Sequence, residues 1–142
     1  MKYYHILLIV FGGIAFFFAL WIFITFAISR TGGWHRLSKT YATSYIPAED
    51  KIIRSQFGKL GVARYKFTLN IAFTNQGLYL SVNKAFRLFH PPLLIPWHKI
   101  KNVEKTTEIM YNYVTMEIDG IRVSLAQKHY EELMRRVSKR EK

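Results

Sequence analysis

The chain has 142 residues, with 21 Lys or Arg against nine Asp or Glu, and a formal net charge of +12. It contains no cysteine, which excludes a disulfide framework, a thiolate nucleophile and a cysteine-ligated zinc site. The positive charge favours an anionic partner, such as an anionic lipid surface, a nucleic acid or an acidic protein.

Residues 6–29 form a long apolar stretch, ILLIVFGGIAFFFALWIFITFAIS, without a charged side chain. A helix rises about 1.5 Å per residue, so roughly 20 apolar residues cross the hydrocarbon core of a bilayer. A cleavable signal peptide has a shorter apolar region and a small-residue cleavage site, whereas Arg30 follows this stretch. We therefore predict a retained transmembrane anchor over residues 1–30. The remaining chain, about 110 residues, suffices for one small domain.

Lys and Arg residues flank the anchor unequally. Only Lys2 precedes it, whereas Arg30, Arg36 and Lys39 follow it closely. Cytoplasmic flanks of membrane helices carry an excess of Lys and Arg. We therefore expect a single-pass protein with its N-terminus outside and its C-terminal domain in the cytoplasm.

Small residues of the anchor fall on one helical face, namely Gly12, Ala15 and Ala19. Small residues let two helix backbones approach closely, so this face is a candidate for helix association, including with a second copy of the chain. Glycine and alanine are also ordinary residues of membrane helices, which is the alternative explanation.

Residues 31–46 are expected to form a juxtamembrane segment. Thr31, Gly32 and Gly33 should break the anchor helix. After this break, apolar side chains recur with helical spacing at Trp34, Leu37, Tyr41 and Tyr45. This spacing predicts a short amphipathic helix that lies either on the membrane or against the following domain.

From residue 47 onward the apolar residues recur with a period of two. In residues 62–74 the pattern places Tyr65 and Phe67 inward, and Arg64 and Lys66 outward. Asn75-Gln76-Gly77 then predicts a hairpin turn into a strand over residues 77–83. A weaker strand is expected earlier, over residues 51–57, and residues 58–61 are expected to form the connecting loop.

The second half of the domain is predicted to continue with short strands and one helix. Pro91, Pro92 and Pro96 favour an edge strand at residues 93–95, because proline cannot donate a ladder hydrogen bond. Asp119-Gly120 predicts a tight turn. The expected strands cover residues 85–90, 100–107, 109–118 and 121–125, followed by an amphipathic helix over 127–138 and a frayed tail over 139–142.

Six or seven antiparallel strands followed by one helix predict an α+β domain over residues 47–138, a rolled antiparallel β-sandwich or barrel closed by its C-terminal helix. The phrases FTLNIAFTNQGLYLSV, LLIPWHKIKNVEKT and VTMEIDGIRVSLA resemble the pleckstrin-homology-like (PH-like) superfamily, in particular its GRAM-like and bacterial PH members. The whole layout resembles small bacterial membrane proteins, which implies a bacterial inner membrane.

Enzyme motifs are absent from the sequence. The five histidines do not form a zinc-binding helix pair, and no phosphate-binding loop or nucleophile elbow occurs. A metal pair between His90 and His98 is a weak alternative. No recognition helix or RNA-binding signature supports nucleic-acid binding. We therefore predict a non-enzymatic protein without a metal site or cofactor.

The PH-like resemblance implies a lipid site at Lys59, Arg64 and Lys66. In lipid-binding PH domains a loop lysine and basic residues two apart on the next strand hold the headgroup phosphates. The alternative is that these cations belong to a solvated basic surface with only diffuse attraction to anionic lipid.

The sequence as a whole favours a binding or scaffolding module that docks a membrane-associated protein. Confinement by the anchor would raise the effective concentration of such a partner. The candidate docking residues are Trp34, Leu37, Tyr41, Phe89, His90 and Trp97, although core packing also accounts for them. The alternative function is binding of anionic phospholipid.

Overall fold

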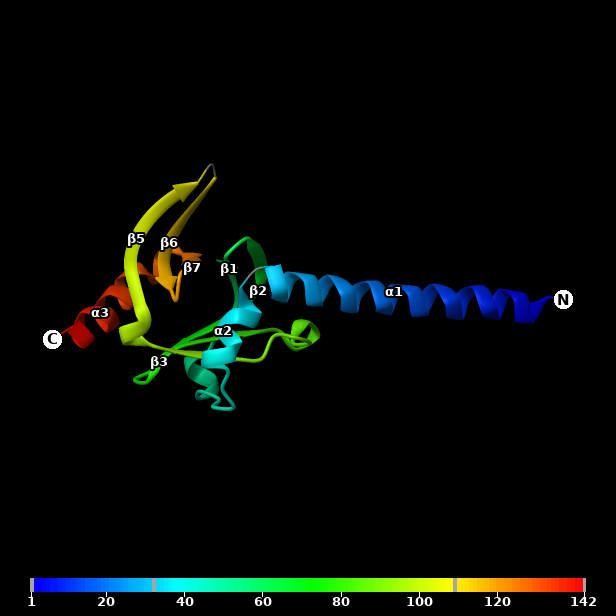
Figure 1. Cartoon of the computed structure of the whole chain (residues 1–142), viewed down its shortest axis with the longest axis horizontal. Coiled ribbons are helices and arrows are strands. Elements are labelled where there is room, and N and C mark those ends of the chain that lie inside the picture. Colours follow the sequence, from blue (N-terminus) through cyan, green and yellow to red (C-terminus); the bar gives the residue numbers. More distant parts are fainter. Residues whose placement is uncertain (1, 32, 109, 142) are drawn as a thin grey trace.

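The computed structural model describes residues 2–31, 33–108 and 110–141. A single long helix, α1 (Tyr3–Thr31), stands out from a β-domain, and the two chain termini lie at opposite ends of the molecule (Figure 1). Helix α1 is long and apolar enough to cross a membrane, and most of its apolar stretch is left exposed by the rest of the protein. The predicted apolar helix is therefore present.

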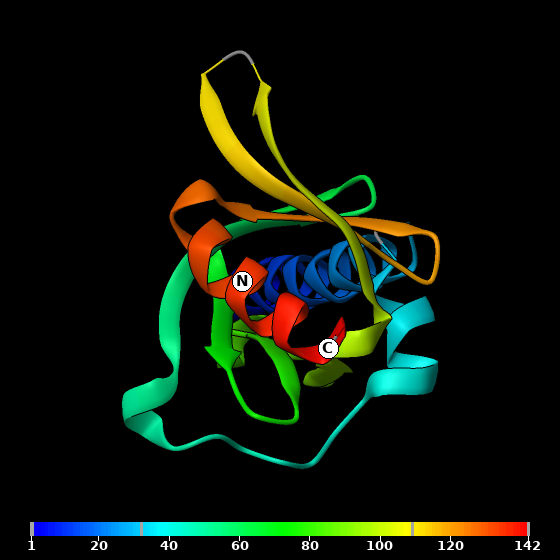
Figure 2. The same ribbon diagram turned by 90° about the vertical axis from the view of Figure 1, so that its left-hand side faces the viewer.

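The β-domain is one seven-stranded antiparallel sheet with the order β4-β3-β2-β1-β7-β6-β5. The sheet curls into a half-barrel, and helix α3 (Tyr130–Glu141) crosses its open side (Figure 2). The strands are β1 (Ile53–Leu60), β2 (Ala63–Phe73), β3 (Gly77–Val82), β4 (Leu93–Pro96), β5 (Ile100–Glu108), β6 (Tyr111–Ile118) and β7 (Ile121–Ala126). This confirms an antiparallel domain followed by a closing helix.

Helix α2 (Trp34–Tyr41) packs against the domain, which is one of the two placements that its amphipathic pattern allowed. Trp34, Leu37 and Tyr41 are all buried in the core. The indole N–H of Trp34 donates to the Pro91 carbonyl at 2.8 Å, and Ala42 forms a bridge with Leu93 of edge strand β4. Helix α2 is therefore part of the packed β-domain.

Strand β2 departs from the predicted alternation at Phe67, whose side chain is 69% exposed instead of buried. Gln56 pairs with Leu69 and Gly58 with Tyr65, so one residue of β1 lies opposite three of β2. The two extra residues form a bulge that keeps Tyr65 and Leu69 inward but turns Phe67 outward. Phe67 has a φ of +57°, a left-handed conformation that is rare for a bulky residue.

Three other local predictions need correction. Residues 58–61 are not a separate loop, because β1 continues to Leu60 and the turn follows it. Residues 85–90 form a short 3-10 helix and a turn instead of a strand, with Phe89 at a φ of +63°. Helix α3 extends to Glu141 and includes most of the expected tail. Gly32, Ile109 and residue 142, which the predictions also covered, lie outside the described residues.

Candidate membrane-facing site

The C-terminal turns of α1 contact the β-domain directly. Ile28 packs against the core, and Thr25 is only 5% exposed. The Phe26 ring meets the Phe89 ring edge-on with 5.2 Å between centroids. Because the apolar stretch ends at Ile28, these contacts place the domain at the end of the apolar helix.

A cavity of about 260 Å³ lies between α1 and β2. Its lining residues are Thr25, Ile28, Arg64, Tyr65, Lys66, Thr68 and His90. The α1 side is largely apolar, because the Thr25 hydroxyl donates within its own helix to the Trp21 carbonyl at 2.9 Å. The β2 side supplies two exposed cations, Arg64 and Lys66. Apolar groups and cations therefore meet in one hollow.

His90 lines this cavity and contacts three segments of the chain. Its Nδ1 lies 2.9 Å from the Leu88 carbonyl, and its Nε2 lies 3.1 Å from the Tyr65 hydroxyl. A carbonyl only accepts, so Nδ1 carries the proton and, in the neutral ring, Nε2 accepts from Tyr65. The ring also packs on Trp34 at 5.2 Å. Burial lowers the pKa of His90, so the neutral form is favoured.

Lys59 does not join Arg64 and Lys66 at the cavity, contrary to the predicted trio. It lies directly opposite Arg64 across the β1–β2 pair. However, its amine donates to Glu108 at 2.6 Å and lies 4.9 Å from the ring centre of Tyr113. The hydrogen bond from Lys59 lowers the pKa of Glu108, although burial opposes it. The charge of Lys59 is therefore already compensated.

Most of the predicted docking residues are core residues. Trp34, Leu37, Tyr41, His90 and Trp97 are each no more than 6% exposed, so their side chains are not accessible to a partner. Their polar atoms are bonded internally: the Tyr41 hydroxyl donates to Asp119, and the Trp97 indole donates to the Thr74 carbonyl. Of the six, only Phe89 keeps substantial exposure, at 42%. The docking surface expected from helical spacing is thus corrected to a packing surface.

The predicted helix-association face of α1 lies away from the domain. Gly12, Ala15 and Ala19 are exposed, and a Cβ added at Gly12 would meet no heavy atom within 4 Å. This face stays a prediction.

A second hollow, of about 360 Å³, contains aromatic residues that sequence reasoning did not single out. Phe57 stacks on Tyr111 and Tyr113 with centroid distances of 5.6 and 5.4 Å. Phe67 and Lys66 line the same hollow. The bulge that exposes Phe67 has no signal in the sequence, because the alternating pattern continues through it. One feature of the sequence pointed to this region, namely the apolar residue Met110 near the tip of the β5–β6 hairpin.

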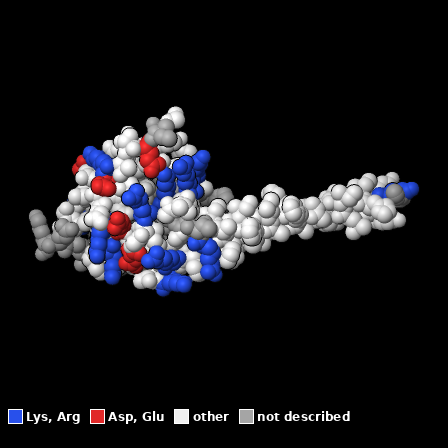
Figure 3. All heavy atoms as spheres, turned by 45° about the horizontal axis from the view of Figure 1, so that its top comes forward, with Lys and Arg blue, Asp and Glu red and all other residues white. Residues whose placement is uncertain are grey.

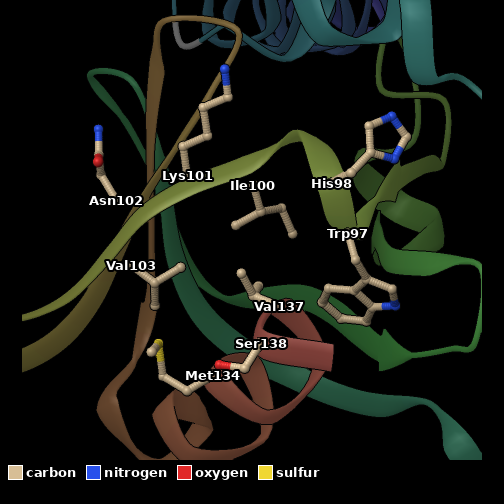
Figure 4. Close-up of a pocket in the computed structure, with 9 residues that line it drawn as sticks. All are labelled: Trp97, His98, Ile100, Lys101, Asn102, Val103, Met134, Val137 and Ser138. Carbon is tan, nitrogen blue, oxygen red and sulfur yellow. The ribbon is translucent and has the colours of Figure 1, made fainter. Parts of the chain in front are cut away.

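Two further hollows lie elsewhere on the domain. One, of about 430 Å³, lies between the start of β5 and α3, where Ile100, Val103 and Met134 face one another and Lys101 points away (Figure 4). The other, of about 420 Å³, lies beside β2 and β3 and contains Arg54 and Arg87. Arg54 pairs with Glu49, and Arg87 donates to the Val82 carbonyl, so both guanidinium groups are engaged.

His90 and His98 line different cavities, which separates the two members of the metal pair considered from the sequence. Within residues 2–31, 33–108 and 110–141, no three His, Asp or Glu residues gather in a way that could hold a metal ion.

Lys and Arg side chains border the region where α1 leaves the domain, whereas the visible Asp and Glu side chains lie farther from the helix (Figure 3). Two of the Lys and Arg residues, Arg64 and Lys66, line the cavity beside α1. Comparison of the chain with protein-family models, with curated proteins and with solved structures finds no match in any of the three.

Proposed function

We propose that this chain is a single-span membrane protein whose β-domain binds anionic phospholipid in the leaflet beside it. The observation that carries this proposal is the cavity between α1 and β2, which has Ile28 of the apolar helix on one side and Arg64 and Lys66 on the other. A phospholipid has the same two parts, an apolar chain joined to a charged phosphate.

The height of the cavity along α1 supports this assignment. Thr25 and Ile28 lie in the last turn of the apolar stretch, where headgroups meet the hydrocarbon core. Arg64 and Lys66 can form charge-assisted hydrogen bonds with a phosphate at that level. Each cation near an anionic leaflet contributes about 1 kcal/mol of attraction.

Retention of α1 and the cytoplasmic position of the domain are part of the proposal. The excess of Lys and Arg after the helix supports a cytoplasmic domain. A bacterial inner membrane and a PH-like assignment are the finer proposals, and seven antiparallel strands with a closing C-terminal helix support the latter. The phosphate contacts proposed here nevertheless differ from those the resemblance implied, because Lys59 is paired with Glu108.

A second candidate function is docking of a membrane-associated protein at the β5–β6 hairpin. The hairpin projects beyond the rest of the sheet (Figure 1). Met110 and Tyr111 near its tip are 83% and 59% exposed, beside the aromatic hollow. Recovery of a partner by the full-length protein but not by a Met110→Ser, Tyr111→Ser variant would support this function.

The lipid proposal is tested with the full-length protein in nanodiscs of phosphatidylcholine, with and without phosphatidylglycerol. Thermal unfolding reports stabilisation by the anionic lipid. Replacement of both Arg64 and Lys66 by Gln should remove about 2 kcal/mol of attraction, which is roughly a thirtyfold loss of affinity. The anionic lipid should then stabilise the variant much less than the unchanged protein.

The matched control replaces two exposed lysines at the α3 end of the domain, Lys99 and Lys128, by Gln. This pair removes the same charge but should leave the stabilisation by phosphatidylglycerol intact. Equal losses in the two double variants would mean that only diffuse charge acts, and would contradict a site at the cavity.

A further inference from the structure

The turn that contains Leu88 and Phe89 lies beside the membrane-spanning helix. It follows the short 3-10 helix Lys84–Phe86 and precedes β4 (Figure 1). Phe89 meets Phe26 edge-on at 5.2 Å, and Phe26 belongs to the apolar stretch that ends at Ile28. A part of the β-domain therefore reaches the level of the hydrocarbon boundary.

The side chains at the tip of this turn are apolar and exposed. Leu88 is 49% exposed and Phe89 is 42% exposed. Two exposed cations, Lys84 and Arg87, precede them in the chain. Apolar tips with adjacent cations are typical of segments that enter the interface of an anionic bilayer, where the apolar groups enter the acyl region and the cations stay with the headgroups.

Three internal hydrogen bonds hold the backbone of the turn. The Arg87 carbonyl accepts from the N–H of His90 at 2.9 Å, and the Lys84 carbonyl accepts from the N–H of Arg87 at 3.3 Å. The Leu88 carbonyl accepts from Nδ1 of His90. Polar backbone groups that enter a membrane need such internal partners.

The conformation of Phe89 also requires an explanation. Its φ of +63° lies in the left-handed region, which costs roughly 1–2 kcal/mol for a residue with a side chain. The surrounding hydrogen bonds hold this conformation. As a result, the ring of Phe89 lies against α1 instead of in the core. Strained residues of this kind are concentrated where a side chain has a function.

We propose that Leu88 and Phe89 insert into the same leaflet that α1 leaves, as a second attachment of the domain to the bilayer. The occupant of this surface is lipid, because the turn is continuous with the lipid-facing surface of α1 through Phe26. Two attachment points restrict tilting of the domain relative to the plane of the bilayer. They thereby keep one face of the domain, including Arg64 and Lys66, against the membrane.

The absence of cysteine makes a direct test practicable, since a single introduced cysteine takes one spin label. The full-length protein is reconstituted in phosphatidylcholine–phosphatidylglycerol vesicles, and collisions of each label with oxygen and with a water-soluble nickel complex are measured. Leu88→Cys is the main reporter. Leu20→Cys in α1 is the lipid reference, and Glu131→Cys on the exposed side of α3 is the water reference.

We expect the label at position 88 to collide with oxygen several-fold more often than with the nickel complex. The lipid reference at position 20 should show the same preference, and the water reference at position 131 should show the opposite one. A position-88 label that behaves like position 131 overturns the proposal. Shielding from both reagents also overturns it, because protein would then cover the turn. An Arg87→Cys variant gives an independent reading if Leu88→Cys does not fold, and its label should lie at the boundary between the two references.

This test does not depend on the lipid site proposed above. Insertion of Leu88 and Phe89 is read from label depth in any fluid bilayer, whereas the Arg64 and Lys66 variants report the effect of phosphatidylglycerol. Either result can therefore fail while the other holds.

Discussion

The β-domain has a helix at each of its two ends, and the two helices contact it in different ways (Figures 1 and 2). Helix α3 lays an apolar face across the curled sheet, where Leu133 and Val137 are buried. Helix α1 contacts the domain only through its last turns, and its remaining apolar surface is exposed. The domain therefore buries the apolar surface of α3, whereas it leaves most of the apolar surface of α1 exposed.

Each of the two helices lines a cavity, and the two cavities differ in size and lining. The larger cavity, of about 430 Å³, lies against α3, and the smaller, of about 260 Å³, lies against α1. Both have basic residues in the lining, Lys101 in the first, and Arg64 and Lys66 in the second. A basic lining therefore does not distinguish the two cavities. The apolar helix that forms one side of the smaller cavity does.

The largest expected effect tests whether the two helices differ in their contribution to stability. Leu133→Ala should lower the free energy of unfolding by about 3 kcal/mol, because it leaves a cavity under α3. Leu8→Ala, the same change at a 67% exposed position of α1, should leave the unfolding of the domain unchanged. Denaturant unfolding in nanodiscs, followed by near-ultraviolet circular dichroism, measures both. Equal losses would contradict the difference.

The next effect makes the same comparison with glycines. A Cβ at Gly77 would overlap the carbonyl oxygen of Ile95 in β4, so Gly77→Ala should cost about 2 kcal/mol as the two strands separate. Gly12→Ala adds the same methyl group to the exposed face of α1, where nothing lies within 4 Å. It should leave the domain as stable as before. A loss of self-association in Gly12→Ala would instead support the predicted helix-association face.

A smaller effect is expected at the exposed bulge in β2. Phe67→Gly should raise the free energy of unfolding by about 0.5 kcal/mol. The change relieves left-handed strain of roughly 1–2 kcal/mol, and the additional chain entropy of glycine offsets part of this gain. Phe67→Ala keeps the Cβ and should give no such gain. The same denaturant unfolding measures both variants. A destabilised Phe67→Gly variant would mean that the ring contributes to packing.

The smallest effect concerns two buried histidines, His90 at the α1 end and His129 at the α3 end. Burial lowers the pKa of both below the ordinary value. As the pH falls below about 6.5, the unfolded chain therefore binds protons before the folded protein does, and stability decreases.

Unfolding measured between neutral and mildly acidic pH checks this expectation. His90→Gln and His129→Gln should each reduce the pH dependence. In His90→Gln the label at Leu88 should also report a change in the turn, because His90 bonds the Leu88 carbonyl. An unchanged pH dependence in both variants would contradict the role of burial.

Much of the fold could be predicted from the sequence because it depends on local patterns. The alternation in residues 62–74 predicted β2 to within one residue at each end. Asp119-Gly120 gave the turn between β6 and β7 because only a short left-handed segment fits there, and both residues have positive φ. Prediction failed at Phe67 and in residues 58–61 and 85–90. In each case, pairing between distant strands or a hydrogen bond across a turn sets the local backbone conformation.

The candidate site was predictable only in part. Arg64 and Lys66 were recognised as outward cations on one strand, and the structure adds their position beside α1. Lys59 belonged to the same pattern, but its compensation depends on Glu108, 49 residues away. Trp34 and Tyr41 have the spacing of an amphipathic helix, and spacing does not tell a membrane surface from a protein core.

Local patterns are therefore enough to predict the apolar helix, the run of short strands, the closing helix and the basic character of the domain, because each follows from the order of neighbouring residues. Which side chains lie at the α1 end of the domain depends instead on the tertiary structure. It brings Ile28, Arg64 and His90 around one cavity and sets Phe89 beside Phe26. Contacts between residues so far apart in the chain arise from packing and strand register, which no local pattern records.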